Sequence, residues 1–372
     1  MIKRLKSLLI ILFGVLLASC VIACGGGNNN DNSQGGDGNG QNVQPEVYTE
    51  GLKFELKEDG TYMVTGCEKE GLTEIIIPST YDGKPVTELS KSAFCEYESL
   101  LSVVIPEGVV RISNRAFYNC NNLESVSISN TVTYLDDDVF HGCSSLKNVE
   151  IPDSVKWIGY GAFFGCKSIS SVSIPYGVEL IMSYAFFGCE SLTDVEIPDS
   201  VIAIMNSAFE GCKGLTSIEI PNSVAYSLGM HAFADCINLE SVNIPMGVTS
   251  ISNGVFKNCC SLTEIDMPDS VSYIGQYVFW GCINLTSVNL GAGVTEIGDY
   301  AFINCPALTT LVIPQSITRM GRDVFMYSRN VSLYFDCEAK WLGREVSQWR
   351  SGASIYWTGE WEYVDGVPTP VI

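Results

Sequence analysis

The sequence has few histidines and few basic residues for its length of 372. A histidine-based triad or zinc site needs several ligands or catalytic groups at one point, and the two histidines, His141 and His231, lie far apart in the chain. Lysine and arginine number 21 against 42 aspartates and glutamates, which gives a formal net charge of −21. Such a surface repels nucleic acid and bare anionic lipid, so we expect neutral, cationic or metal-bridged partners.

The sequence also lacks an apolar run near its start that is long enough to span a membrane. The run LLIILFGVLLA is shorter than the ~20 residues required, and basic residues precede it. This pattern predicts a signal peptide over residues 1–24. Cys20 in LASC and Cys24 in VIAC both resemble the lipobox of bacterial lipoproteins, in which the cysteine carries the lipid. We expect lipidation at Cys24, with Cys20 as the alternative and a plain secretory leader as the competing interpretation.

Residues 25–45 contain almost no apolar side chains. Burial therefore cannot offset the entropy lost on ordering, and a flexible Gly/Asn-rich tether is expected. At ~5 to 6 Å times the square root of its length, such a tether holds the folded body roughly 25 Å from its anchor.

A repeat occupies most of the remaining sequence, from about residue 72 to residue 335. Its phrase is L-x-x-V-x-I-P followed by x-x-V-x-x-I-G-x-x-A-F-x-x-C. The copies are 23 residues apart, with one step of 24, and each is marked by a phenylalanine: Phe94, Phe117, Phe140, Phe163, Phe186, Phe209, Phe233, Phe256, Phe279, Phe302 and Phe325. Because no such coil can bury its apolar side alone, the period predicts a β-rich leucine-rich-repeat solenoid of about eleven coils.

Within each coil, the L-x-x-V-x-I segment alternates as a strand does. Val126 and Ile128 are expected to point inward, and Ser125 and Ser127 outward. One short strand per coil then stacks into a parallel sheet, and the following proline ends the strand because it cannot donate to the ladder. V-x-x-I is expected to return as a second extended piece, and A-F-x-x-C to form a tight turn.

The two ends of the repeat need caps, because a terminal coil leaves one apolar face uncovered. Residues 46–90 are expected to form an N-terminal cap and first coil, with a β-hairpin around Asp59-Gly60. Residues 91–335 are the solenoid, and residues 336–372 a C-terminal cap. The competing interpretation of the last segment is a carbohydrate-stacking site formed by its tryptophans, Trp341, Trp349, Trp357 and Trp361.

Nine of the fifteen cysteines occupy one repeat position, three residues after the marker phenylalanine. This periodicity predicts buried, reduced thiols that pack as small hydrophobic groups. Cys67 and Cys95 lie outside that column and are the better candidates for a disulfide.

Two stretches identify a resemblance to a known family. IPDSVKWIGYGAFFGC at 151–166 and IPDSVIAIMNSAFEGC at 197–212 resemble the BspA-like leucine-rich repeats of bacterial surface proteins, over about residues 50–335. The resemblance implies a secreted or surface-held binding protein and no chemistry, and some members of the family adhere to host or bacterial partners. Bulges are expected where the pattern departs, at Ser129-Asn130, at Gly291 and at the extra residue near Ala225-Tyr226.

The candidate binding residues follow from the repeat, because repeats present like groups in rows, which suits binding better than catalysis. One set consists of outward carboxylates of the strand stack, where like charges invite calcium or a basic protein patch: Glu150, Asp194, Glu196, Glu219, Glu264 and Asp266. A second set follows the marker phenylalanine by one residue: Tyr118, Phe164 and Phe187. The competing interpretations are a solvated acidic face and rings packed on their neighbours. The same two interpretations, a binding site or a solvated acidic face, apply to Asp136, Asp137 and Asp138.

We therefore predict a non-catalytic, lipid-anchored protein of the bacterial cell surface that uses no cofactor or metal. It is expected to bind an extracellular protein or glycan ligand through its repeats, to contact the membrane only through its lipid, and to bind no nucleic acid. The alternative is a carbohydrate-binding or carbohydrate-active surface protein.

Overall fold

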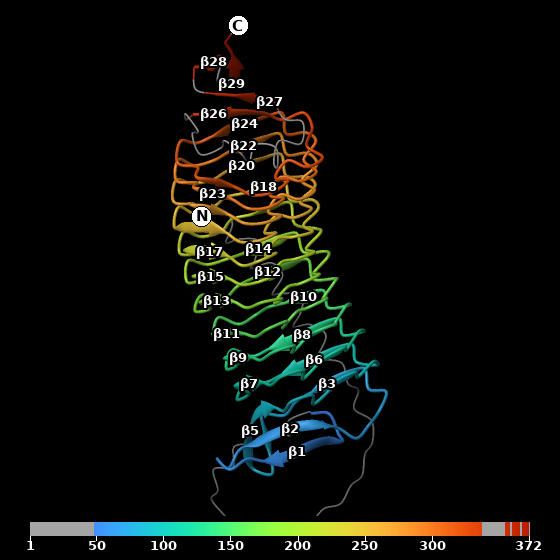
Figure 1. Ribbon diagram of the computed structural model, residues 1–372. Coiled ribbons are helices and arrows are strands. Elements are labelled where there is room, and N and C mark those ends of the chain that lie inside the picture. Colours follow the sequence, from blue (N-terminus) through green and yellow to red (C-terminus); the bar gives the residue numbers. More distant parts are fainter. Residues whose placement is uncertain (1–47, 337–353, 358, 365–366, 372) are drawn as a thin grey trace, which may run out of the picture. The chain divides into compact units, whose positions relative to one another are not determined.

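The computed structural model describes residues 48–336, 354–357, 359–364 and 367–371. These residues form strands and turns and contain no helix. Figure 1 shows them as a stack of coils, with the N-terminal hairpin at one end and the C-terminal strands at the other. The leader, both lipobox cysteines, the tether, Trp341 and Trp349 lie outside the described residues.

The N-terminal cap is a hairpin of β1 (Leu52–Leu56) and β2 (Tyr62–Cys67). Its strands pair antiparallel, and its turn is closed by a hydrogen bond of 2.8 Å from the amide of Lys57 to the carbonyl of Thr61. β2 then pairs in parallel with β5 (Lys84–Leu89), which also pairs with the short β4 (Thr80–Tyr81). The expected hairpin cap is confirmed.

Strands formed by L-x-x-V-x-I lie above one another, with β27 of the C-terminal segment added after the last of them, and we call this row the first ladder. Its strands pair in parallel within short sheets that follow one another along the stack. The members are β3 (Glu74–Ile76), β6 (Ser102–Ile105), β8 (Ser125–Ile128), β10 (Asn148–Val149), β12 (Ser171–Ser173), β14 (Asp194–Glu196), β16 (Ser217–Ile218), β18 (Ser241–Val242), β20 (Glu264–Asp266), β22 (Ser287–Asn289), β24 (Thr310–Ile313), β26 (Ser332–Phe335) and β27 (Ser354–Tyr356).

The V-x-x-I segments form a second row of parallel strands, the second ladder. The one short strand expected in each coil is confirmed by the first ladder. The return segment forms a second strand, because it pairs in parallel with the equivalent segment of the next coil. Figure 1 shows β7, β9, β11 and β13 on one side of the stack and β6, β8 and β10 of the first ladder on the other. The members after β5 are β7 (Arg111–Ile112), β9 (Tyr134–Leu135), β11 (Trp157–Ile158), β13 (Leu180–Ile181), β15 (Ala203–Ile204), β17 (Tyr226–Leu228), β19 (Val248–Ile251), β21 (Tyr273–Ile274), β23 (Glu296–Ile297) and β25 (Arg319–Met320).

The core between the ladders is a column of phenylalanines. All eleven marker phenylalanines are buried, and the ring centroids of successive copies lie 5.0 to 6.0 Å apart. Leu, Ile, Val and Ala at the other repeat positions fill the space around them. The inward positions of both ladders thus serve one continuous core.

The nine repeat cysteines are buried and free, as the periodicity predicts. Each thiol donates a hydrogen bond to the carbonyl of the marker phenylalanine one coil earlier, as Cys120 does to Phe94 at 3.0 Å. Burial raises the pKa of these thiols, to about 12 for Cys120, which keeps them protonated and able to donate. In the last copy Ser328 takes the cysteine position and donates to the carbonyl of Phe302 at 2.7 Å.

The disulfide expected between Cys67 and Cys95 is absent, because both cysteines are free and half-buried. The Cys67 sulfur lies beside Gly51 at the edge of the hairpin, 3.7 Å from where a Cβ of that glycine would stand. Cys95 lies in the turn of the first coil, immediately after its marker phenylalanine.

Of the expected bulges, one is present and two are not. At the extra residue near Ala225-Tyr226, the register of β17 on β19 shifts between Tyr226 and Ser227, and Thr249 of β19 lies between the two residues with which they pair. At Ser129 and Gly291 the usual turn is kept, because the turn needs only the carbonyl of the residue at the proline position. That carbonyl accepts from Val132 at 3.2 Å and from Val294 at 3.2 Å, as that of Pro152 accepts from Val155 at 2.9 Å.

At the C-terminal end, the two described tryptophans of the tail pack on the last coil. Trp357 lies 4.7 Å from Phe335 between ring centroids, and the indole N–H of Trp361 donates to the Phe335 carbonyl at 3.2 Å. Trp361 also begins β28 (Trp361–Val364), which forms a hairpin with β29 (Val367–Pro370). The aromatic cap is therefore present, and these two rings are engaged in packing.

Candidate functional site: the outward faces of the two ladders

The six carboxylates predicted on the first ladder are all exposed, and they extend from Glu150 to Asp266. Strand register determines their neighbours. Ser171 pairs with Asp194 and Ser173 with Glu196, while Ser287 and Asn289 pair with Glu264 and Asp266. The expected direct contact between like charges is therefore wrong for these strands, because serine or asparagine stands opposite each acid.

Glu196 and Glu219 are the exception, since they hold equivalent positions in successive coils. The first ladder is interrupted there, because β14 pairs with β12 and β16 pairs with β18 in separate sheets. Nearby, a hollow of about 560 Å³ is bordered by the carboxylates Glu219, Glu264 and Asp266. Its other polar lining includes Ser217, Ser241 and Asn243.

Within the described chain, none of the six carboxylates forms an ion pair with a lysine, arginine or histidine, as every ion pair found there involves other acids. Glu196 accepts a hydrogen bond of 3.3 Å from Ser173, which is the one side-chain hydrogen bond found for these six acids in the described part of the chain. The described residues also contain no group of three or more His, Cys, Asp or Glu placed to hold a metal ion. The acidic face therefore presents negative charge to solvent without internal compensation.

The predicted aromatic column forms a continuous stack. Tyr118 lies 4.6 Å from His141, His141 lies 4.4 Å from Phe164, and Phe164 lies 4.5 Å from Phe187 between ring centroids. His141 also contacts Asp138, at 3.3 Å from Nδ1 to Oδ1. All four rings are half-buried, so they pack on one another as the competing interpretation proposed. His141 holds the same repeat position as the three predicted residues, so its place in the stack follows from the sequence. The prediction did not include it because its ring is an imidazole.

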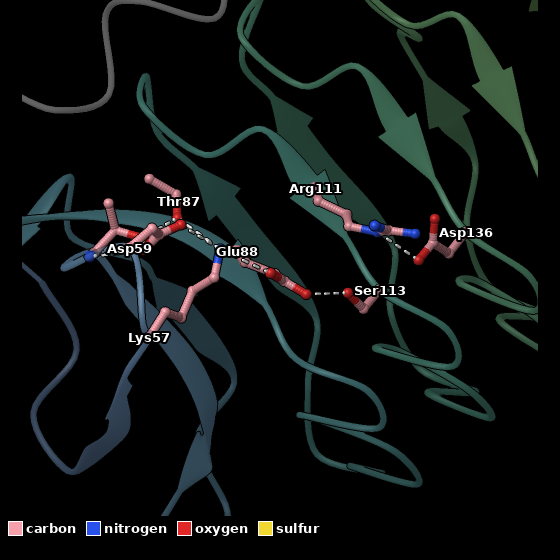
Figure 2. Close-up of polar contacts among 8 residues, drawn as sticks. Lys57, Asp59, Thr87, Glu88, Arg111, Ser113 and Asp136 are labelled. Carbon is pink, nitrogen blue, oxygen red and sulfur yellow. Dashed lines mark hydrogen bonds and ion pairs between the residues drawn. The ribbon is translucent and has the colours of Figure 1, made fainter.

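Four acids on or next to the strands of the second ladder, in contrast, are paired with cations: Glu88, Asp136, Glu296 and Asp299. Figure 2 shows Lys57 of the hairpin reaching Glu88, with Nζ 3.1 Å from Oε2, and Ser113 donating to the same carboxylate at 2.7 Å. Arg111 donates from Nε to Oδ2 of Asp136 at 2.8 Å. That hydrogen bond raises the pKa of the Arg111 guanidinium above its usual value.

The far end of the second ladder repeats this arrangement. Arg319 lies 2.6 Å from Glu296, and Arg322 lies 3.0 Å from Asp299. The backbone amide of Arg322 also donates to Asp299 at 2.9 Å. That backbone hydrogen bond, followed by the side-chain contact, lowers the pKa of Asp299. These four carboxylates are therefore compensated, whereas the six of the acidic face are not, although Glu124 beside the first ladder also has a partner, Lys147, at 2.7 Å.

The sequence profile of the BspA-type leucine-rich repeat region, a unit of six copies, matches residues 87–216 and 204–332, which together are more than half of the chain. The chain belongs to this family. The BspA-type repeats account for both ladders and for the phenylalanine column, and no helix in the described residues is long and apolar enough to cross a membrane.

Two solved structures resemble this BspA-type chain over most of its length. A leucine-rich cell-surface protein from Faecalibacterium prausnitzii A2-165 is 29% identical, with a TM-score of 0.58, covering 85% of this chain and 96% of its own. A leucine-rich repeat protein from Bacteroides ovatus is 26% identical, with a TM-score of 0.51, covering 84% of this chain and 99% of its own. No curated protein matches the chain.

Proposed function

We propose that this BspA-type protein is a non-catalytic binding protein held at the bacterial cell surface, which takes a cationic partner on the acidic face of its first ladder. One observation carries the proposal. The six carboxylates of that face are exposed and have no ion-pair partner in the described chain, although Glu88, Asp136, Glu296 and Asp299 of the second ladder each have one. A binding or adhesion role is also what the family suggests.

The chemistry of the face favours a basic protein segment as the partner. Carboxylates spread over several coils at the strand spacing of ~4.8 Å can each meet a separate lysine or arginine of an extended chain. The serine and asparagine neighbours supply hydroxyls and amides that bond to a peptide backbone. Rows of like groups do not supply the unlike acid, base and nucleophile that a catalytic site needs.

The test measures binding of an eight-residue lysine peptide to the protein by calorimetry, with and without calcium. Changing Asp194, Glu196 and Glu219 together to serine removes three charges from the face. At ~0.5 kcal/mol for each exposed charge pair, this weakens binding by about tenfold. Binding to the parent should also weaken with salt, because charges are screened over ~8 Å at physiological ionic strength.

A matched control removes the same charge elsewhere. Asp153, Glu179 and Asp199 are exposed acids outside the first ladder, and their change to serine should leave peptide affinity close to that of the parent. Equal weakening in both triple variants would reduce the effect to net charge and overturn the proposed site.

Surface attachment is proposed to depend on a lipid at Cys24, with Cys20 as the alternative. The F. prausnitzii relative is described as a cell-surface protein, which supports the location. The Cys20→Ala, Cys24→Ala double variant should leave the detergent phase on phase partitioning, and the two single variants should show which cysteine carries the lipid. A double variant that partitions as the parent does would contradict the anchor.

A further inference from the structure

A shallow hollow of about 290 Å³ lies on the outward face of the second ladder, away from the acidic face of the first. Aromatic rings and fixed polar groups meet in it. Its lining residues are Arg111, Asn114, Tyr134, Asp136, Asp137 and Trp157.

Two aromatic residues form the apolar part of this hollow. Tyr134 of β9 and Trp157 of β11 are direct partners in the parallel pairing, so their Cα atoms lie about one strand spacing apart, ~4.8 Å. They are 46% and 37% exposed. The Arg111 guanidinium lies over the Tyr134 ring, with Cζ 5.4 Å from the ring centroid, so a ligand can contact Trp157 and the part of Tyr134 that Arg111 leaves exposed. Tyr160, which is 45% exposed, follows in the same coil as Trp157.

The polar part of the hollow is held in place from behind. The Asp136 side chain is only 9% exposed, and its Oδ2 accepts the hydrogen bond from Arg111. Asp137 accepts from the backbone amide of Tyr160 at 2.8 Å through Oδ1, and from Asn114 at 3.4 Å through Oδ2. Carboxylates and a guanidinium have more hydrogen-bonding sites than these contacts use, so acceptors and donors remain for a ligand. Figure 2 shows Arg111 and Asp136 from this group directed at one another beside the rest of the network.

We propose that this hollow binds a hexose unit of a neutral polysaccharide. A pyranose ring has a C–H face, which packs on Tyr134 and Trp157, and a rim of hydroxyls, which both donate and accept. Those hydroxyls can donate to Asp136 and Asp137 and accept from Arg111. Open hollows with an aromatic wall and a few fixed polar groups fix the orientation of such ligands at little entropic cost.

The charges of the hollow favour a neutral ligand. Two carboxylates face one guanidinium, and the whole chain carries −21, so an acidic polysaccharide would be repelled. A protein side chain that covered the hollow would remove water from Asp136 and Asp137 without replacing every hydrogen bond, which is costly. The hydroxyls of a sugar can take over the hydrogen bonds of the water that they displace. A protein contact is better served by the apolar residues farther along the same face, such as Ile202, Met205 and Met230.

The experiment measures retention of the full chain in gels that contain a neutral β-glucan, α-glucan, mannan or galactan, with polygalacturonate as the acidic comparison. The parent should be retained by at least one neutral polysaccharide and not by polygalacturonate. Trp157→Ala and Tyr134→Ala should each weaken that retention by about tenfold or more, since buried aromatic contacts dominate small interfaces. Trp157→Phe should restore part of it by returning an apolar ring.

Trp280 provides the matched control, because it is 38% exposed, against 37% for Trp157, but lies in the A-F turn away from this hollow. Trp280→Ala should be retained as the parent is, and equal thermal midpoints should show that all variants are folded. Retention by none of the neutral polysaccharides, or equal loss in the Trp157 and Trp280 variants, would overturn the proposal. The proposal would also be overturned if the parent bound only the lysine peptide and Trp157→Ala abolished that binding, because the hollow would then be a protein-binding site. Loss of peptide binding at the first ladder leaves this inference standing, because the two sites share no residue.

Discussion

The two ladders share one backbone, one period and one core, yet their outward faces differ in charge compensation. On the first ladder Glu264 and Asp266 stand exposed without a cation, while on the second ladder Glu296 and Asp299 bind Arg319 and Arg322. These residues lie within three coils of each other. The contrast therefore cannot come from the fold, which imposes the same register and spacing on both rows.

What the contrast shows is a division of labour within each coil. Inward positions are shared by the two ladders and are fixed by packing, so valine, isoleucine, leucine and phenylalanine recur there. Outward positions are constrained only by solubility and partners. Glu88, Asp136, Glu296 and Asp299 of the second ladder have ion-pair partners, whereas the six carboxylates of the acidic face have none in the described chain.

The largest predicted effect comes from the core that both ladders share. Phe186→Ala removes a fully buried ring that stacks 5.4 Å from both Phe163 and Phe209, and the stacked coils cannot collapse into the space. We expect a loss of about 3 to 5 kcal/mol in the free energy of unfolding, which denaturant titration measures. Both ladders should loosen together in hydrogen exchange. Loss of protection in only one ladder would contradict a shared core.

The cysteine column predicts a smaller effect that depends on one hydrogen bond. The Cys212 thiol donates to the Phe186 carbonyl at 3.2 Å, and burial raises its pKa well above the usual value. The backbone amide of Cys189 also donates to this carbonyl, at 3.2 Å, so Cys212→Ala removes one of two hydrogen bonds and should cost about 0.5 to 1.5 kcal/mol. Cys212→Ser should retain most of the stability, because Ser328 already performs this role. Thermal midpoints decide, and equal losses for alanine and serine would show that sulfur packing matters instead.

Ser328 and Cys212 also show how far the sequence alone leads. Periodicity was enough to predict the coil, the inward face, the hairpin cap and the buried cysteines, because each follows from a fixed spacing along one chain. The thiol donating to a carbonyl one coil earlier was not predictable, because it depends on how successive coils are offset. The pairing of Arg111 with Asp136, 25 residues later, depends on the same offset. The hollow between Tyr134 and Trp157 requires the second ladder, whose strands the sequence pattern indicated only as an extended return.

Acid should weaken the compensated ladder through Asp299. Its pKa is lowered in the folded protein, first by the backbone hydrogen bond from Arg322, so its stabilising effect is present above the usual pKa of aspartate and is lost as pH falls through the lowered value. Asp299→Asn should cost about 1 kcal/mol at neutral pH, since Arg322 is largely exposed. The difference from the parent should disappear in acid, as measured by unfolding at several pH values. Glu219→Gln on the first ladder is the control at neutral pH, and a loss there equal to that of Asp299→Asn would contradict the contrast between ladders.

The smallest effect should come from removing charge from the first ladder. Asp194, Glu196 and Glu219 make no ion pair in the described chain, and Glu196 and Glu219 hold equivalent positions in successive coils. Their joint change to serine removes repulsion and places there the residue that β12 already carries at both outward positions. We expect the free energy of unfolding to stay level or rise by ~0.2 to 1 kcal/mol at low salt, and this gain to shrink as salt is added. The triple variant at Asp153, Glu179 and Asp199 should show a weaker gain, because Asp153 and Asp199 lie in turns and Glu179 lies in the segment before β13, so these acids do not share one strand row. A clear loss of stability in the first-ladder variant would mean that its carboxylates support the fold, and the argument that they are left for a partner would then fail.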